Sequence, residues 1–375
     1  MPLTHSSKPR RLRGCHPLIP RLLTVVLVGA AGVLTATIAV AETARTEPSE
    51  LKTFRFEFDN DTFLGSDDAF TAGWSFQFHS RMMDRWTPAF AGWIGKIPGL
   101  GDDGEGGRVT RWAGALSQLI ITPTDITIEE PQPHDAPWAG MLGVTSTWSS
   151  YSNERLGAIQ AYLGCLGPCS RAEEVQRFVH EDLGWGETPR GWDNQLANRA
   201  LANLNYEYRH KLHVDEDAAY LPGRFGNDLA IGGQGAFGNV ATFLQLEIEF
   251  RFGWGMPMGF SKIPDPAGIG MVLDPVYIDP ESPPMNLAGW RLYFTVVARH
   301  AWLRYLAAAE GGPTTNDHDQ PPLDSYPGRR QALLGVHLGC VPFSVHLTYY
   351  RYLEPLPRNI VGSSDWVNLS FEFRF

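Results

Sequence analysis

His180 is the residue in this chain with the best setting for acid–base chemistry. It lies in a helix-like segment, 170–184, and the stretch around it continues through glycines to the polar run Trp192–Gln195. Imidazole titrates near neutral pH, so a positioned histidine can take a proton from a water molecule that attacks an ester. A histidine that only makes a structural hydrogen bond at the edge of a packed helix is the alternative, and the helix alone leaves both open.

Oxygen-bearing side chains gather near the first two strand-like segments. Asn60 and Asp61 close the first segment and Thr71 opens the second, so a hairpin would bring the three to one rim. Carboxylate and amide oxygens are ligands that Ca²⁺ prefers, although Asn and Asp also form ordinary turns. The chain has no Gly-x-Ser-x-Gly elbow, so the sequence does not support a serine hydrolase of that kind.

The helix that carries His180 has its own start, stop and packing signals. Ser170 and Glu173 have the spacing of a capping box, and Gly184 is a natural stop. We expect an apolar stripe to hold the helix against the wall of the β-barrel that the strand-like segments predict (below). His180 and Gln176 would face a cleft between the helix and this wall. The stripe consists of Ala172, Val175, Phe178, Val179 and Leu183.

Alternation of apolar and polar residues, typical of strands with two different faces, runs through most of the chain. We expect an all-β fold, a transmembrane antiparallel β-barrel of about 12 strands with a short loop helix that carries His180. The apolar face would meet lipid and the charged face would line the lumen, whereas a soluble sandwich would turn the apolar face inward. The alternation is clear in 54–58, 74–78, 244–252, 343–350 and 367–375, and weaker near 111–119, 140–148, 156–163, 203–213, 228–234, 290–299 and 331–339.

Three stretches interrupt this strand pattern. Residues 81–108 and 254–288 are rich in Gly and Pro, and residues 309–329 are polar, with Pro and Asp. These compositions predict loops.

The two ends favour the membrane barrel over the sandwich. Basic residues precede the apolar stretch Leu22–Val40, and Ala39–Ala41 is a small-x-small cleavage site. We therefore expect a signal peptide at 1–41 and an outer-membrane β-barrel domain at 42–375, with a retained membrane anchor as the alternative. The last strand alternates and ends on Phe375, which resembles the C-terminal signature of bacterial outer-membrane proteins.

Composition narrows the class of partner. The 375 residues carry a formal net charge of −10, which argues against nucleic acid as a partner, because proteins that bind nucleic acid need a basic face. The 12 Trp, 12 Tyr and 20 Phe suit the aromatic girdles of a barrel. Cys165 and Cys169 are close enough in sequence to pair in an oxidising envelope, which would leave Cys340 odd.

Taken together, the motifs resemble the LpxR-like lipid A 3′-O-deacylase family of the bacterial outer membrane. The resemblance covers nearly the whole chain after the predicted signal peptide and is densest over 54–210. Each motif is weak alone, but their order is specific. The matching segments are Phe58–Phe63, Asp68–Gly73, Thr122–Pro123, Asp135–Gly140, Gly167–Pro168, Glu174–His180 and Gly191–Gln195.

The resemblance implies a calcium-dependent carboxylic ester hydrolase that removes acyl chains from lipid A, the lipid part of lipopolysaccharide. Its partners would be this substrate and the other outer-membrane lipids around the barrel. His180 would activate water, Asn60 and Thr71 would be the polar groups of the first two strands, and Ca²⁺ would stabilise the oxyanion. Asp61 is the matching metal ligand.

The chain departs from the family pattern at two places. The family carboxylate six residues after the histidine is replaced by Gly186, and Glu187 is the neighbouring candidate ligand. The family's basic cluster is replaced by residues 128–134, which are acidic and contain no Lys or Arg. Without this cluster, we expect Arg171, Arg177 or Arg190 to bind the phosphates of the substrate, or phosphate recognition to differ from that of the family. Two alternatives stay open: a non-catalytic barrel acting as a channel or scaffold, and a phospholipid-directed lipase on the same fold.

Overall fold

The chain divides into two units, Met1–Thr46 and Glu47–Phe375, and only the second contains described residues. The structure, a computed structural model, describes residues 51–60, 70–86, 89–101, 108–132, 135–184, 186–215, 224–263, 265, 270–277, 290–306, 328–340, 342–353 and 365–375. The predicted signal peptide lies outside the described residues and stays a prediction.

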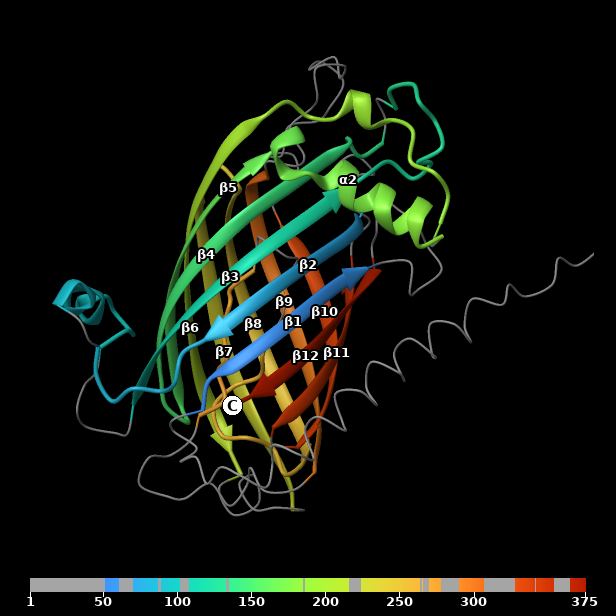
Figure 1. The fold of residues 1–375 in the computed structure, drawn as a ribbon. Helices are drawn as coiled ribbons and strands as arrows, with labels where there is room; N and C mark the ends of the chain where they lie inside the picture. Colours follow the sequence, from blue (N-terminus) through green and yellow to red (C-terminus); the bar gives the residue numbers. More distant parts are fainter. Residues whose placement is uncertain are drawn as a thin grey trace, which may run out of the picture. The chain divides into compact units, whose positions relative to one another are not determined.

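The second unit is a closed antiparallel barrel in which every strand pairs with its sequence neighbours (Figure 1). Pairing of the first and last strands, from Thr53 opposite Arg374 to Asn60 opposite Val367, closes the ring. The predicted barrel is confirmed. Its strands are β1 Thr53–Asn60, β2 Phe70–His79, β3 Val109–Ile121, β4 Ala139–Tyr151, β5 Arg155–Leu166, β6 Arg199–Val214, β7 Phe225–Gly238, β8 Ala241–Trp254, β9 Arg291–Leu306, β10 Arg329–Cys340, β11 Phe343–Tyr352 and β12 Asp365–Arg374.

The two faces of the strands divide by polarity as the alternation predicts. Large apolar side chains such as Phe76, Leu163 and Leu246 point outward and are exposed, while Arg55 and Gln77 point inward and are buried. An apolar outer surface around a charged interior is the arrangement of a barrel that crosses a membrane.

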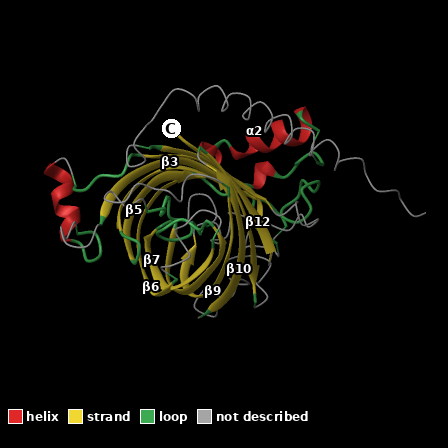
Figure 2. Ribbon diagram, turned by 90° about the horizontal axis from the view of Figure 1, so that it is seen from below, coloured by secondary structure: helices red, strands yellow, loops and turns green. Residues whose placement is uncertain are grey.

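The helical elements lie outside the barrel wall (Figure 2). The connection from β5 to β6 contains η4 Pro168–Ser170, α2 Ala172–Arg177, the π-helical turn η5 Phe178–Asp182 and η6 Trp192–Asn194. Among the described residues, no helix is long and apolar enough to cross a membrane.

The connection from β2 to β3, predicted as a loop, contains a short helix and packs on the outer wall. Its 3₁₀-helix, η3 Ala89–Lys96, buries Ile94, and Leu100 follows it against Ile159 of β5. A Cβ at Gly157 would lie 2.2 Å from the carbonyl oxygen of Gly99, so the loop touches the strand backbone there.

The connection from β8 to β9, predicted as a loop, folds into the lumen (Figure 2). Phe260 and Leu273 are buried inside the barrel. Asp274 accepts hydrogen bonds from Thr53 Oγ1 and Arg111 Nη1, each 2.7 Å long. The described parts of this connection, 255–263, 265 and 270–277, are called the plug here. The charged residues on the inner face of the strands account for the position of the plug. Their groups are buried in a filled lumen, so polar groups of the plug take the place of water as partners.

Candidate functional site

The π-helical turn that follows α2 lies on the outer side of the barrel (Figure 1), and His180 is part of this turn. Its Nδ1 lies 2.7 Å from the backbone carbonyl oxygen of Glu187. A carbonyl only accepts hydrogen bonds, so Nδ1 carries the proton that is donated. In the neutral ring the lone pair is therefore on Nε2, which is the state a general base needs. Single π turns inside helices occur often at functional sites.

Gly186 lets the loop close against the imidazole ring. Its φ is +145°, and a Cβ at this position would lie 2.6 Å from Nδ1 of His180. The family carboxylate thus has no room here, because the imidazole ring of His180 lies where the side chain would begin. The side chain of Glu187 is exposed, so its predicted metal role stays a prediction.

The helix is fixed to the barrel wall through backbone contact and a small apolar cluster. A Cβ at Gly140 would lie 2.2 Å from both Ala172 Cβ and Ser170 Oγ, so η4 and α2 rest directly on β4. Gln118 of β3 donates a 2.7 Å hydrogen bond to the carbonyl of Ser170. Seating the helix on the wall limits where His180 can move. The cluster consists of Ile120, Ile126, Trp138, Ala172 and Trp192, with Val175 packed against it.

The predicted capping box at Ser170 is wrong. The hydroxyl of Ser170 donates to the carbonyl of Gly167 at 2.7 Å, which closes the turn of η4. Arg171 is the N-cap instead, in the left-handed conformation with φ of 58°. Glu173 accepts a 2.9 Å hydrogen bond from Arg177, and this bond raises the pKa of Arg177. Pro168 accounts for the difference, because it favours the tight turn that uses the serine hydroxyl.

The predicted apolar stripe is only half correct. Ala172 and Val175 pack on the wall, but Phe178 and Leu183 are 53% and 46% exposed. Gln176 does not face a cleft with His180, since it is buried and accepts a 2.7 Å hydrogen bond from Nε1 of Trp192. The π turn rotates later residues away from the regular helical stripe, which explains the exposed pair. Gly184 follows with φ of 69°, so the predicted stop is confirmed.

A disulfide joins Cys165, near the end of β5, to Cys169 in η4. The sequence left this pairing open. The bond ties the start of the helical segment to the barrel wall, four residues along the chain, and Cys340 is a free cysteine.

The predicted residues of the first two strands are only partly described. Asn60 is the last residue of β1, beside Asp59, whose Oδ1 accepts a 2.8 Å hydrogen bond from Asn368. Asp61 lies outside the described residues. Thr71 is the extra residue in β2 where the register with β3 shifts between Phe70 and Ala72. Such bulges re-aim side chains near functional sites.

Within the described ranges, no group of three or more His, Cys, Asp and Glu residues is arranged to hold a metal ion. The carboxylate of Glu187, one loop residue beyond the ring of His180, makes no ion pair with a described residue. A free, exposed carboxylate beside the candidate base is a hard oxygen donor, which fits Ca²⁺ rather than a softer metal. Asn60 could add an amide oxygen of the same character.

Two features of the site were missed from the sequence. The hydrogen bond that orients His180 is accepted by a backbone carbonyl, and the type of residue does not predict such a contact because every residue has this group. The bond between Gln176 and Trp192 joins residues 16 apart in the chain. The paired glycines Gly184 and Gly186 were the available signal, because such pairs often let a loop fold back tightly.

Comparisons with known proteins place the chain in a family. The family model "Outer membrane protein LpxR" matches residues 26–352. No curated protein matches. The solved structure "LpxR from Salmonella typhimurium" is 15% identical, with a TM-score of 0.64, over 86% of this chain and 99% of that one.

Other barrels match more loosely. The KdgM porin in complex with disordered oligogalacturonate is 5% identical over 87% of this chain and 99% of its own, with a TM-score of 0.31. The translocator domain of autotransporter NalP from Neisseria meningitidis is 8% identical over 94% and 96%, with a TM-score of 0.34. The family model covers most of the chain and the fold is that of a solved LpxR structure, so the chain belongs to the LpxR family of outer-membrane proteins.

Proposed function

We propose that this protein is an outer-membrane deacylase that hydrolyses an acyl ester of lipid A, at the 3′-O position that the family resemblance implies. Membership of the LpxR family supports the substrate class. The observation that carries the chemistry is the 2.7 Å hydrogen bond from Nδ1 of His180 to the Glu187 carbonyl, which leaves Nε2 free to take a proton.

The residues around His180 suit attack by water on an ester. Nε2 of His180 takes one proton from water as the oxygen attacks the acyl carbon, and the carbonyl of Glu187 stabilises the imidazolium through Nδ1–H. When the ester bond breaks, the same Nε2–H returns the proton to the departing sugar oxygen. The products are a free fatty acid and a hydroxyl, so the histidine ends in its starting state.

Calcium is part of the proposal. Asp61 and Glu187 would hold it with carboxylate oxygens. Asn60 at the end of β1 and Thr71 at the start of β2 lie at the same rim of the barrel. Bound there, the ion would supply positive charge where the oxyanion develops. Asp61 and the Thr71 side chain fall outside the described residues, so these roles remain proposals.

The place of the helix supports a lipid substrate. α2 and η5 lie on the outer wall, next to exposed apolar residues of the barrel, and Phe178 and Leu183 are exposed on the same helical segment. A lipid in the membrane can approach this side directly, without entering the lumen. This arrangement favours an acyl-chain substrate over a solute that passes through the barrel.

Phosphate recognition bears on the choice between lipid A and a phospholipid. Arg171 pairs with Glu174 at 2.6 Å, and Arg177 pairs with Glu173 and Glu181 at 2.9 and 3.0 Å. Arg190 is exposed and makes no ion pair with a described residue, so it is the cation of the three that is left for a phosphate. A phospholipid-directed lipase is therefore the second candidate, favoured by the acidic stretch 128–132 beside the site, where Asn194 binds the Glu129 carbonyl at 2.6 Å.

The decisive experiment is mass spectrometry of lipid A from cells that express the wild-type protein, His180→Asn or an empty vector. We expect loss of one acyl chain with the wild type alone. The purified protein is assayed in parallel on lipid A and on a phosphatidylethanolamine vesicle, each with calcium or with a chelator. Fatty acid released only from the vesicle would favour the lipase, and release that survives chelation would remove calcium from the mechanism.

A further inference from the structure

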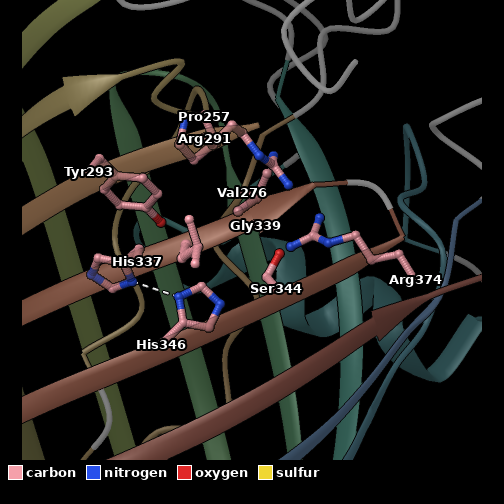
Figure 3. A pocket seen from close by; sticks show the side chains of 10 residues that line it. Pro257, Val276, Arg291, Tyr293, His337, Gly339, Ser344, His346 and Arg374 are labelled. Carbon is pink, nitrogen blue, oxygen red and sulfur yellow. Dashed lines mark hydrogen bonds between the residues drawn. The ribbon is translucent and has the colours of Figure 1, made fainter. Parts of the chain in front are cut away.

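A second polar site lies inside the barrel (Figure 3), where β12 ends, at the end opposite α2 (Figure 1). Strands β9 and β11 begin there and β10 and β12 end there, and the plug closes one side with Pro257 and Val276. The cavity has a volume of about 10 Å³, the space that a single water-sized group needs. Its polar lining consists of Arg291, Tyr293, His337, Ser344, His346 and Arg374.

The lining is unusual because its charged members are cations. Arg291 is only 5% exposed, and it makes no hydrogen bond or ion pair with any residue that the structure describes. Arg374 uses Nη2 to bind Glu372 at 3.0 Å and Asp274 at 3.2 Å, while its buried Nε has no hydrogen-bond partner. In Figure 3 both arginines reach toward the side of the cavity where Ser344 presents its hydroxyl.

The surrounding ion pairs do not balance the charge. The described charged groups that interact with Arg291, Arg374 and each other around the seam of β1 and β12 include the cations Arg55, Arg111 and Lys262 and the anions Glu57, Asp274 and Glu372. Contacts join Arg55 to Glu372, Arg111 to Asp274, and Lys262 to Glu57. Arg374 shares two of these carboxylates, and none of the three forms an ion pair with Arg291 among the described residues. An isolated buried charge is strongly unfavourable unless a counter-charge accompanies it.

The two histidines of the lining cannot supply that counter-charge. Nδ1 of His337 lies 2.6 Å from Nδ1 of His346, and Nε2 of His337 lies 2.9 Å from Oγ1 of Thr295. Nε2 of His346 is buried without a hydrogen-bond partner, 3.4 Å from a carboxylate oxygen of Glu372. A neutral or protonated imidazole brings no negative charge, so the described groups around the cavity keep an excess of positive charge.

We propose that this cavity binds a small monovalent inorganic anion, of which chloride is the test case, between Arg291 and Arg374. The size of the cavity excludes a sugar phosphate or a lipid headgroup, and the guanidinium donors suit an anion that accepts several hydrogen bonds. The anion ties β9 to β12 and to the plug. This site lies inside the barrel, whereas His180 lies on its outer wall, so the inference does not depend on the proposed hydrolysis.

The first test measures the thermal unfolding midpoint, Tm, of the full-length protein in detergent. Sodium chloride is compared with sodium gluconate at equal ionic strength, because gluconate is too large for the cavity. We expect chloride to raise Tm by a few degrees with a saturating concentration dependence. In Arg291→Met this dependence should disappear, and the variant in gluconate should be at least as stable as the wild type because the unpaired charge is gone. Equal Tm of the wild type in both salts would overturn the site.

Two control variants separate the site from general salt effects. Arg85→Gln removes an exposed arginine in the β2–β3 connection and should keep the full chloride dependence. Arg291→Lys keeps the positive charge and should keep a chloride dependence at a higher midpoint concentration, which also covers the case in which Arg291→Met fails to fold. Loss of the dependence in Arg85→Gln would mean that chloride acts elsewhere.

The second test locates the ion. Crystals grown in sodium bromide should show an anomalous peak between Arg291 and Arg374 in the wild type and none in Arg291→Met. A peak that persists in Arg291→Met, or no peak in the wild type, contradicts the assignment.

Discussion

The lumen and the outer face of α2 use charged and polar side chains in opposite ways. Inside the barrel, Arg209 alone contacts Glu207, Glu247 and Glu249, and most charged groups have several partners. On the outer face, His180 is held by one hydrogen bond to a backbone carbonyl, and its other nitrogen is free. The dense network of ion pairs in the lumen thus stabilises the barrel. The outer face, which has few contacts, leaves Nε2 of His180 without a partner among the described residues. Density of charge is a poor guide to the candidate catalytic face of this molecule.

The difference has a physical cause. A charge buried in a filled lumen must be paired, since removing one partner leaves the other desolvated. A general base must instead keep one lone pair unoccupied until substrate arrives. The comparison therefore predicts that lumen variants change stability and that outer-face variants change turnover.

The largest effect is expected at His180. His180→Asn keeps a side chain of similar shape that cannot take a proton at neutral pH, so turnover should fall by about 10²–10⁴-fold. Fatty-acid release in micelles with saturating calcium measures this. The barrel's Tm should not change, since the imidazole is not part of its core. Near-normal release by this variant would assign the base to another group.

The matching lumen variant is Asp274→Ala. It removes the carboxylate that Thr53, Arg111 and Arg374 share, so the unfolding free energy should fall by about 3–5 kcal/mol. Urea unfolding followed by the electrophoretic mobility of the folded barrel measures it. Turnover per folded molecule should remain normal. If turnover instead falls with unchanged stability, the division between lumen and outer face is wrong.

Gly186→Ala tests the position of the base rather than its presence. The new Cβ would meet Nδ1 of His180 at 2.6 Å and displace the ring, and a displacement of about 1 Å can cost up to about 10²-fold in rate. Gly184→Ala is the matched control, because it has a positive φ too but its Cβ would meet nothing within 4 Å. Equal turnover of the two variants would show that loop strain, not the ring contact, matters.

The smallest effect is expected from Gln176→Leu. It removes the 2.7 Å hydrogen bond to Trp192 and leaves a buried indole N–H without a partner, which should cost the helical segment about 1–3 kcal/mol. Hydrogen exchange of residues 172–182 should increase while that of the strands does not. Unchanged exchange in the helix would mean that the wall contacts alone hold it.

The sequence was sufficient for the barrel because alternation is local. Each strand shows its inward and outward face in its own residues, as Arg55 and Phe56 do in β1. The helix is predicted for the same reason, but the capping-box spacing places its cap at Ser170, whereas the turn at Pro168 uses the Ser170 hydroxyl and makes Arg171 the cap. The exposed Phe178 and Leu183 follow from a π turn, which a regular helical period does not reveal.

The plug and the ring contact of His180 could not be predicted. Asp274 pairs with Arg111, 163 residues away, and nothing local in the segment 254–288 distinguishes a surface loop from one inside the lumen. The Glu187 carbonyl is a backbone group that every residue has. Both depend on where the chain returns in space, which is fixed only once the barrel is closed.

The plug also bears on how the barrel is assembled. Asp274 touches Thr53 of the first strand and Arg374 of the last, and Arg55 of β1 joins Glu372 of β12 beside it. These contacts span the seam where the two ends of the sheet meet. They are complete only when the seam has formed and the plug is inside. Plug residues, which are distant in sequence from both end strands, therefore stabilise the last strand pairing, and a barrel that closes without them would be a distinct, less stable product.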